Sequence, residues 1–165
     1  MNNSTVEQAD APENTKYELL TTDTVKSWNG RTLYRIRALV AIAAIGVSAG
    51  DLGGYIEKQD NLQVYGDAWV YGNARVYGNA RVSLNIHFGW MSHVGSEDGT
   101  LTWYRAKEGI QVNRGCFYGT LEAFENAVSK THGDNQSAKE YRCLIDFIKL
   151  RSSSWVNEET DQEAA

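Results

Sequence analysis

A six-residue period is the strongest pattern in this chain of 165 residues. Residues 64–82 read VYGDAWVYGNARVYGNARV, in which valine, tyrosine, glycine and a turn residue recur at that spacing. Neither an α-helix, with a period of about 3.6, nor a single strand, with a period of about 2, produces such a repeat. A short strand followed by a sharp corner does, and three such units make one triangular turn of a parallel β-helix.

Two series of apolar or small residues follow this period and are expected to fill the coil, because residues two apart share a face of a strand. One series is Val64, Val70, Val76, Val82, Phe88 and Val94, and the other is Leu62, Ala68, Ala74, Ala80, Ile86 and Ser92. The glycines at 66, 72 and 78 are predicted to form corners with left-handed backbone angles. Looser units upstream, at Gly54/Ile56 and Ile45/Val47, extend the prediction to two or three coils.

In such a coil the outward residues stack on those eighteen positions further along. This places Trp69 under His87, Arg75 under His93, and Gln63 under Arg81. All six are therefore expected to point outward.

The segments on either side of the repeat predict hairpins and helices. Residues 17–40 read as a β-hairpin around Asn29-Gly30, a tight-turn sequence. A second hairpin, with strands from Thr100 and Ile110, precedes a helix that Thr120 caps and Gly133 ends. A capping box at 137–140 opens a second helix. The predicted organisation is a disordered tail (1–15), a hairpin plus coil (16–95), a ββαα module (96–151) and an acidic tail (152–165).

Composition excludes several classes of protein. The net charge of −5 argues against coating of DNA and against stable binding of a nucleic-acid duplex. No apolar run reaches the roughly 18 residues of a membrane span, and the polar start lacks a signal peptide, so we expect a cytoplasmic protein. Cys116 and Cys143 lack metal-ligand spacing and are expected to be buried free thiols. We expect no metal and no cofactor.

Two parts of the sequence resemble known proteins. The stretch KYEL…NGRTLYRIRAL…GDLGGYIEKQDNLQVYGDAWVYGNARVYGNARV resembles bacterial and bacteriophage hexapeptide-repeat proteins, and residues 94–151 resemble a phage-associated module that is found attached to such coils. The resemblance implies that the coil is left-handed, with a right-handed coil as the alternative, and that the protein is a homotrimer in a phage or prophage setting. The predicted fold is therefore mainly β with C-terminal α, a short left-handed parallel β-helix of two to three coils between a β-hairpin and a module of a hairpin and two helices.

The resemblance also raises the hypothesis of an acyltransferase, in which His87 or His93 would act as a general base. A short coil offers little wall for an acyl carrier, and neither histidine has a carboxylate at a stacked position. We therefore assign no catalytic residue. A module that serves only for trimerisation or assembly is another hypothesis.

The favoured hypothesis is a non-catalytic binding protein. Arginines interleaved with aromatic residues are suited to phosphates and bases. The residues predicted to bind are Arg37, Trp90, Trp103, Tyr104, Arg105 and Arg114. The partner would be a small nucleotide signal or a host defence protein, which makes a counter-defence role the expected one. In the opposing interpretation the arginines are solvated and the tryptophans line the trimer seam.

Overall fold

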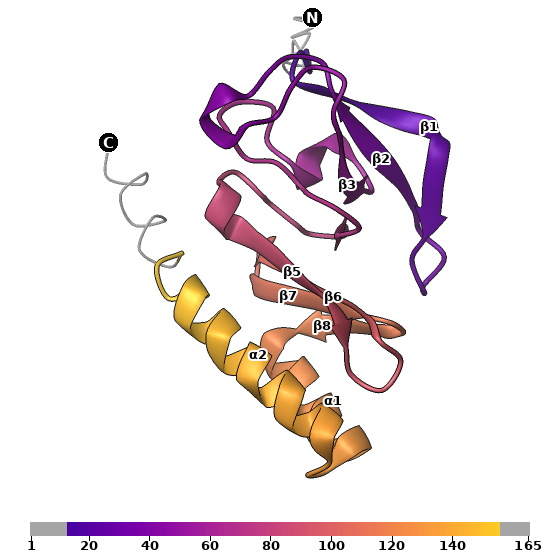
Figure 1. Cartoon of the computed structure of the whole chain (residues 1–165), viewed down its shortest axis with the longest axis vertical. Helices are drawn as coiled ribbons and strands as arrows, with labels where there is room; N and C mark the ends of the chain where they lie inside the picture. Colours follow the sequence, from indigo (N-terminus) through magenta and orange to yellow (C-terminus); the bar gives the residue numbers. More distant parts are fainter. Residues whose placement is uncertain (1–12, 156–165) are drawn as a thin grey trace, which may run out of the picture.

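Two four-stranded sheets and two C-terminal helices make up the fold in the computed structural model, which describes residues 13–155 (Figure 1). The first sheet is mixed, since β1 and β2 and then β2 and β3 pair antiparallel, whereas β3 and β4 pair parallel. Its strands, in sheet order, are β1 (Tyr17–Lys26), β2 (Thr32–Ala38), β3 (Leu52–Ile56) and β4 (Arg75–Val76).

The second sheet is antiparallel throughout and leads into the helices. Its strands follow in chain order as β5 (Phe88–Val94), β6 (Gly99–Ala106), β7 (Gly109–Arg114) and β8 (Phe117–Thr120), and then come α1 (Leu121–His132) and α2 (Gln136–Ser152). Short 3-10 helices lie in the connections, at Ala43–Ile45, Gln59–Asn61 and Asn85–His87.

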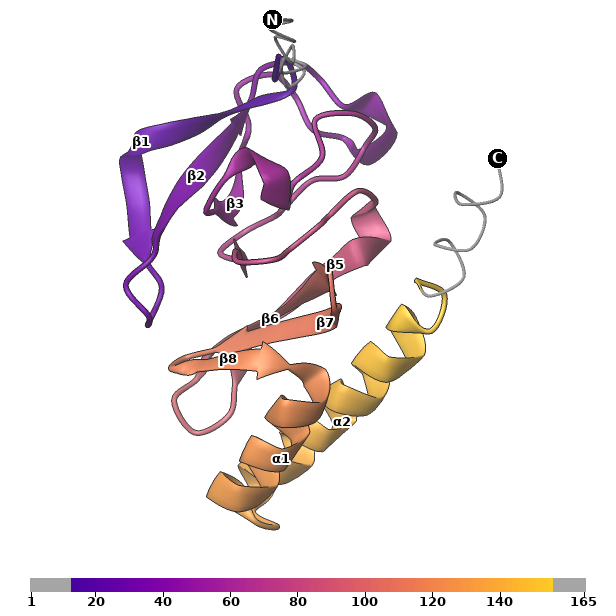
Figure 2. The ribbon, with the colours of Figure 1, turned by 180° about the vertical axis from the view of Figure 1, so that it is seen from behind.

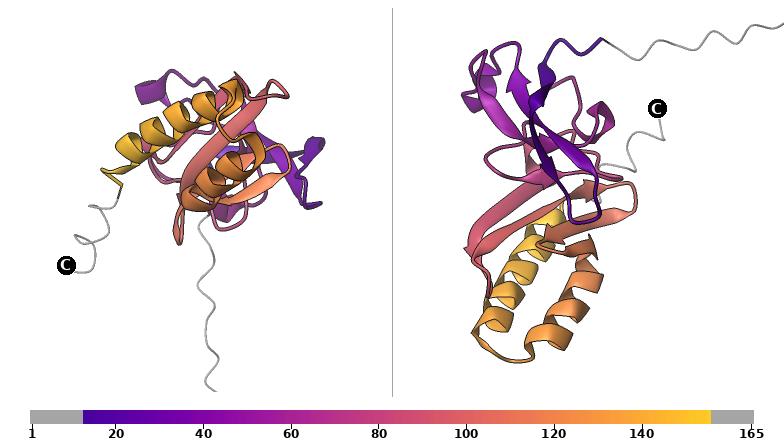
Figure 3. Two further views of the ribbon diagram at one scale, coloured as in Figure 1. Left: turned by 90° about the horizontal axis from the view of Figure 1, so that it is seen from below. Right: turned by 90° about the vertical axis from the view of Figure 1, so that its right-hand side faces the viewer.

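The second sheet is the middle layer of the molecule, with the first sheet on one side and the helices on the other (Figure 2). Strand β6 shows why, because successive side chains of a strand point to opposite faces. Leu101 and Trp103 pack with residues of α1 and α2, whereas Tyr104 belongs to the core of the first sheet. Both faces of the middle sheet are therefore buried, and the right-hand view of Figure 3 shows the same order of layers.

The predicted left-handed β-helix is wrong, and so is its right-handed alternative. The structure has a β-sandwich-like arrangement of two sheets, and within residues 64–82 only Arg75–Val76 forms a strand. After Val82 the chain does not continue around a coil, because β5 pairs antiparallel with β6. A hairpin partner close in sequence, β6, pairs with one edge of β5, whereas each repeat unit is too short to build a long parallel ladder.

The burial pattern of the repeat is nevertheless largely as predicted. Its inward positions are at most 2% exposed at Leu62, Ala68, Val70, Ala74, Val76, Ala80 and Val82. The glycines at 66, 72 and 78 have φ of 73°, 56° and 67°, as their role as corners requires. The segment therefore wraps a core without becoming a regular coil.

Two of the residues expected to point outward from the repeat segment are buried. Trp69 and His87 are 1% and 0% exposed. The hairpin of β1 and β2 explains the burial of Trp69, because Tyr17 at the start of β1 packs edge-on against its indole at 6.4 Å. The predicted stacking of Trp69 under His87 is therefore wrong, and His87 instead packs edge-on against Trp155.

Two consecutive glycines of β3 allow the repeat segment to lie directly on the first sheet. A Cβ atom on Gly53 would come within 2.5 Å of Val70 O, and one on Gly54 would come within 2.6 Å of Val70 Cγ1. With no Cβ in the way, the N–H of Gly54 donates to Val70 O at 2.7 Å, and that of Tyr55 to Ala74 O at 2.9 Å. The two glycines are thus required by close backbone approach.

The hairpin at 100–110 and the first helix are confirmed, including the Thr120 cap and the end at Gly133. The second helix begins earlier than the capping box predicted, because Asn135 Oδ1 accepts from the N–H of Ala138. Both cysteines are free thiols, but they are exposed rather than buried.

The predicted tails at 1–15 and 152–165 lie mostly outside the described residues. Where the structure describes them, Ser152 and Trp155 are 5% and 4% exposed and pack at the end of α2. Among residues 13–155, no helix has the length and apolarity needed to cross a membrane.

Replacement of Gly54 by Ala tests the close approach of the repeat to β3. The added methyl group meets the Val70 side chain and the backbone oxygen of Ala74, at 2.6 and 2.8 Å. Overpacking of this kind costs about 1–3 kcal/mol of unfolding free energy. Leu52→Ala is the control in the same strand, because Leu52 is 57% exposed, and it should cost less than about 0.5 kcal/mol. Urea denaturation measures both, and equal stability of Gly54→Ala and wild type would contradict the packing.

Lys16 gives the stability a predictable dependence on pH. Its buried Nζ donates to Gln63 O and Ala68 O, at 3.2 and 2.5 Å, and burial lowers its pKa from 10.5 to about 8. Above pH 8 the folded state loses this proton before the unfolded state does, so unfolding free energy should rise with pH. The window ends near pH 9.5, where tyrosines of the unfolded chain begin to ionise, since their ordinary pKa is about 10.

The measurement is urea denaturation of wild type and of Lys16→Met from pH 7.5 to 9.5. The difference in unfolding free energy between the two should grow in favour of wild type as the pH rises. A difference that stays constant across this range would show that the Lys16 ammonium is not destabilised by burial.

Candidate functional site

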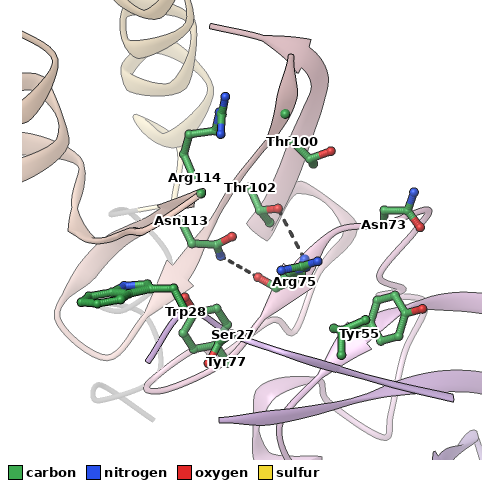
Figure 4. Close-up of a pocket in the computed structure, with 13 residues that line it drawn as sticks. Ser27, Trp28, Tyr55, Asn73, Arg75, Tyr77, Thr100, Thr102, Asn113 and Arg114 are labelled. Carbon is green, nitrogen blue, oxygen red and sulfur yellow. Dashed lines mark hydrogen bonds between the residues drawn. The ribbon is translucent and has the colours of Figure 1, made fainter. Parts of the chain in front are cut away.

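A polar cavity of about 360 Å³ lies between the two sheets, beside the turn of the first hairpin (Figure 4). Its walls come from three places that are distant in sequence, namely the end of β1 with its turn, β3 to β4 with the adjoining repeat corner, and the inner face of β6 and β7. The lining residues are Val25, Ser27, Trp28, Tyr55, Asn73, Arg75, Tyr77, Gly99, Thr100, Thr102, Asn113, Arg114 and Gly115.

Two hydrogen bonds to its backbone hold Arg75 at the cavity. Its N–H donates to Thr102 Oγ1 at 3.4 Å, and its carbonyl oxygen accepts from Asn113 Nδ2 at 2.6 Å (Figure 4). Thr102 and Asn113 are 1% and 6% exposed, so both are fixed in the face of the middle sheet. The short strand β4 is thereby tied to the second sheet as well as to β3, and the position of the Arg75 side chain at the cavity is set from both sides.

The guanidinium of Arg75 brings positive charge to this cavity. Within residues 13–155, Arg75 has no ion pair, although Arg31, Arg35 and Arg37 each have one. Among residues 13–155, no Asp or Glu lines the cavity. In a chain with a net charge of −5, a cavity walled by arginine and neutral polar groups is a local exception to the overall charge.

The two tyrosines of the lining add no negative charge near neutral pH. Burial raises the pKa of Tyr77 to about 12. Desolvation also raises the pKa of Tyr55, whose hydroxyl donates to Asp23 Oδ1 at 3.0 Å and accepts from Arg35 Nη2 at 2.7 Å. Both phenols therefore stay protonated, and Asp23 is neutralised outside the cavity by Arg35.

Trp28 forms an exposed aromatic wall at the rim, with 62% of its surface open to solvent. The turn that carries it is fixed by Ser27, whose hydroxyl accepts from the N–H of Arg31 at 2.9 Å and lies 2.5 Å from Asn29 Oδ1. Gly30, with φ of 84°, completes the turn as the Asn-Gly sequence predicted. A rigid turn thus presents an indole ring beside a polar, cationic cavity.

Trp103 and Tyr104 do not form the predicted platform. They are neighbours on β6, so they point to opposite faces of the middle sheet, and they are 6% and 0% exposed. Trp103 packs edge-on with Phe147 of α2, and the Tyr104 hydroxyl donates to Tyr77 O at 3.1 Å. Trp103 therefore belongs to the core beneath the helices, and Tyr104 belongs to the core of the first sheet.

The two arginines predicted beside that platform are also separated. Arg105 Nη1 lies 3.3 Å from His87 Nε2. Arg114 lines the cavity but directs its guanidinium away from Arg75, donating to Val94 O at 3.0 Å and lying 3.8 Å from Glu97 (Figure 4). Of the two, only Arg114 reaches the cavity wall.

The other two predicted binding residues lie elsewhere on the molecule. Trp90 is 36% exposed and stacks with Tyr71 and Phe88, at centroid distances of 6.0 and 5.7 Å. Arg37 donates to Glu18 at 2.6 Å. Neither Trp90 nor Arg37 lines the cavity.

The two histidines considered as general bases differ in their surroundings. His87 is buried, and its Nδ1 accepts from the N–H of Leu84 at 3.1 Å, so it closes a turn. His93 is exposed, and its Nδ1 lies 2.9 Å from Asp98 Oδ2. Sequence reasoning missed Asp98, because the carboxylate comes from the turn after β5 and not from a stacked position of a coil.

Most residues of the cavity were missed from the sequence, and of the predicted binding residues Arg114 alone lines it. Thr102 and Asn113 gave no signal, because threonine and asparagine are common in strands and turns. Trp28 carried one usable signal, since an aromatic residue directly before an Asn-Gly turn is held at the tip of a hairpin.

Among the described residues there is no group of three or more His, Cys, Asp or Glu side chains that would hold a metal ion. Comparisons with protein-family models, with curated proteins and with solved structures give no match to this chain. The resemblance to hexapeptide-repeat proteins and the phage setting therefore stay predictions.

Proposed function

We propose that this protein binds a small anionic ligand of the nucleotide class in the cavity between its two sheets, without transforming it. The observation that carries the proposal is a cavity in which, among the described residues, the charged lining residues are Arg75 and Arg114 and none is acidic. A guanidinium favours phosphate because its planar donors match the phosphate oxygens. Arg75 supplies these donors, since the Arg114 guanidinium is directed away.

The neutral groups of the cavity support a ligand with hydrogen-bonding edges. Asn73, Thr100 and Asn113 line it together, and amide and hydroxyl groups both donate and accept. Trp28 at the rim is suited to stacking against a planar base, an interaction worth about 1–3 kcal/mol per base. The volume of about 360 Å³ falls within the range of roughly 300–1,000 Å³ that small-molecule sites occupy.

A counter-defence role by sequestration of a nucleotide signal is the biological setting that we propose for such binding. Inhibition of a host defence protein, a purely structural role and acyl transfer remain the competing hypotheses. A nucleotide absorbing near 260 nm in protein purified from a bacterial host would support sequestration.

Arg75→Ala should weaken nucleotide binding by about 1.5–3 kcal/mol, the range for a lost hydrogen bond to a charged group. This corresponds to a dissociation constant that is about 10- to 150-fold higher. Isothermal titration calorimetry with a panel of nucleotides, and with pyrophosphate as an anion without a ring, measures the change. Arg81→Ala is the matched control, because Arg81 is exposed and lies outside the cavity lining. Equal binding by wild type and Arg75→Ala would refute the site.

Trp28→Ala should distinguish the contribution of the nucleotide base to binding from that of its phosphates. Loss of the indole should weaken binding of the nucleotides by about 1–3 kcal/mol while leaving pyrophosphate binding unchanged. The variant should fold normally, because Trp28 is 62% exposed. If pyrophosphate and nucleotides lose affinity equally, Trp28 does not stack on a base, and the ligand class is a simple anion.

A further inference from the structure

The outer face of α2 carries apolar side chains that the fold leaves partly or largely exposed to solvent. The inner face packs into the helical core through Ala138, Tyr141, Ile145 and Ile148. Away from these residues Cys143 is exposed and Leu150 is 75% exposed, and Phe147 is 47% exposed although one edge of its ring packs against Trp103 at 6.2 Å. Spacings of four and three residues place these three side chains in one stripe along the helix.

This spacing is that of a coiled-coil seam. With Phe147 at position a of a heptad, Cys143 and Leu150 fall at position d. The flanking positions are then also defined, with Asp146 at g and Arg151 at e. In a parallel pair of helices, a residue at g lies beside the residue at e of the following heptad in the partner.

The charges of α2 are complementary in that register. Asp146 of one copy would face Arg151 of the next, and the same contact would recur by symmetry. Within the described chain neither Asp146 nor Arg151 makes an ion pair. An antiparallel pair would place e positions against e positions, and those of α2 are Ser137, Leu144 and Arg151, which offer Arg151 no carboxylate.

We propose that the outer face of α2 is a self-association surface, on which a second copy of this chain docks with its α2 in parallel register. The apolar stripe of Cys143, Phe147 and Leu150 forms the seam, and Asp146 and Arg151 set the direction. The surface is separate from the cavity, and a dimer and the predicted homotrimer both use it.

Parallel register makes a specific chemical prediction, because Cys143 of one copy then faces Cys143 of the next. Diamide takes two hydrogen atoms from a pair of thiols, which leaves a disulfide. Mild diamide treatment should therefore give a covalent dimer on a non-reducing gel. Cys116→Ser should cross-link as wild type does, and Cys143→Ser should not. Cross-linking that depends on Cys116, or none in the wild type, would overturn the proposal.

Exchange of charges tests the direction independently of the cysteines. Asp146→Arg and Arg151→Asp should each raise the dissociation constant of self-association about tenfold in sedimentation equilibrium, because each places like charges together. The double variant should restore wild-type association, which a folding defect would not. Lys130→Asp on α1 is the control. A monomer at every concentration, or single variants that associate as wild type does, would refute the surface.

Discussion

Direct backbone contact between β3 and the repeat segment is the constraint on which the rest of the structure depends. Gly53 and Gly54 leave no room for a Cβ atom, since Val70 O lies 2.5 Å and Ala74 O 2.8 Å from where one would stand. The two hydrogen bonds made there fix the start of a wrap that buries Val70 and continues into the parallel pairing of Ile56 with Val76. Two glycines inside a strand lose more conformational entropy on folding than other residues would. This cost is offset because the repeat segment closes the core of the first sheet.

The candidate site is a consequence of this wrap. Pairing with β3 brings β4 beside the middle sheet, where Thr102 and Asn113 bond both sides of the Arg75 backbone. One strand of two residues is thus shared between the two layers. Its inward residue, Val76, is buried in the core, and its outward residue, Arg75, places a guanidinium in a cavity that no carboxylate of the described chain lines. The same alternation that builds the core therefore also builds the site.

The sequence predicted local features of this protein better than its topology. The inward residues of the repeat, its three glycine corners, the hairpin before α1 and the Thr120 cap all follow from rules that act over a few residues. The β-helix prediction failed because a period of six fixes which residues point inward but not which strands pair. Pairing of β5 with β6 was decided by a short turn downstream. The cavity was missed because Trp28, Arg75 and Asn113 come from distant parts of the chain and meet only where the two sheets lie against each other.

A crystal structure of the protein soaked with a nucleotide is the measurement that tests the central claim most directly. The claim is that the wrap on β3 presents Arg75 to a ligand cavity between two sheets. It predicts density for a phosphate within hydrogen-bonding distance of the Arg75 guanidinium, with the base against Trp28 and β4 paired to β3. Nucleotide density elsewhere on the protein, or residues 62–82 coiled as a continuous β-helix, would contradict it.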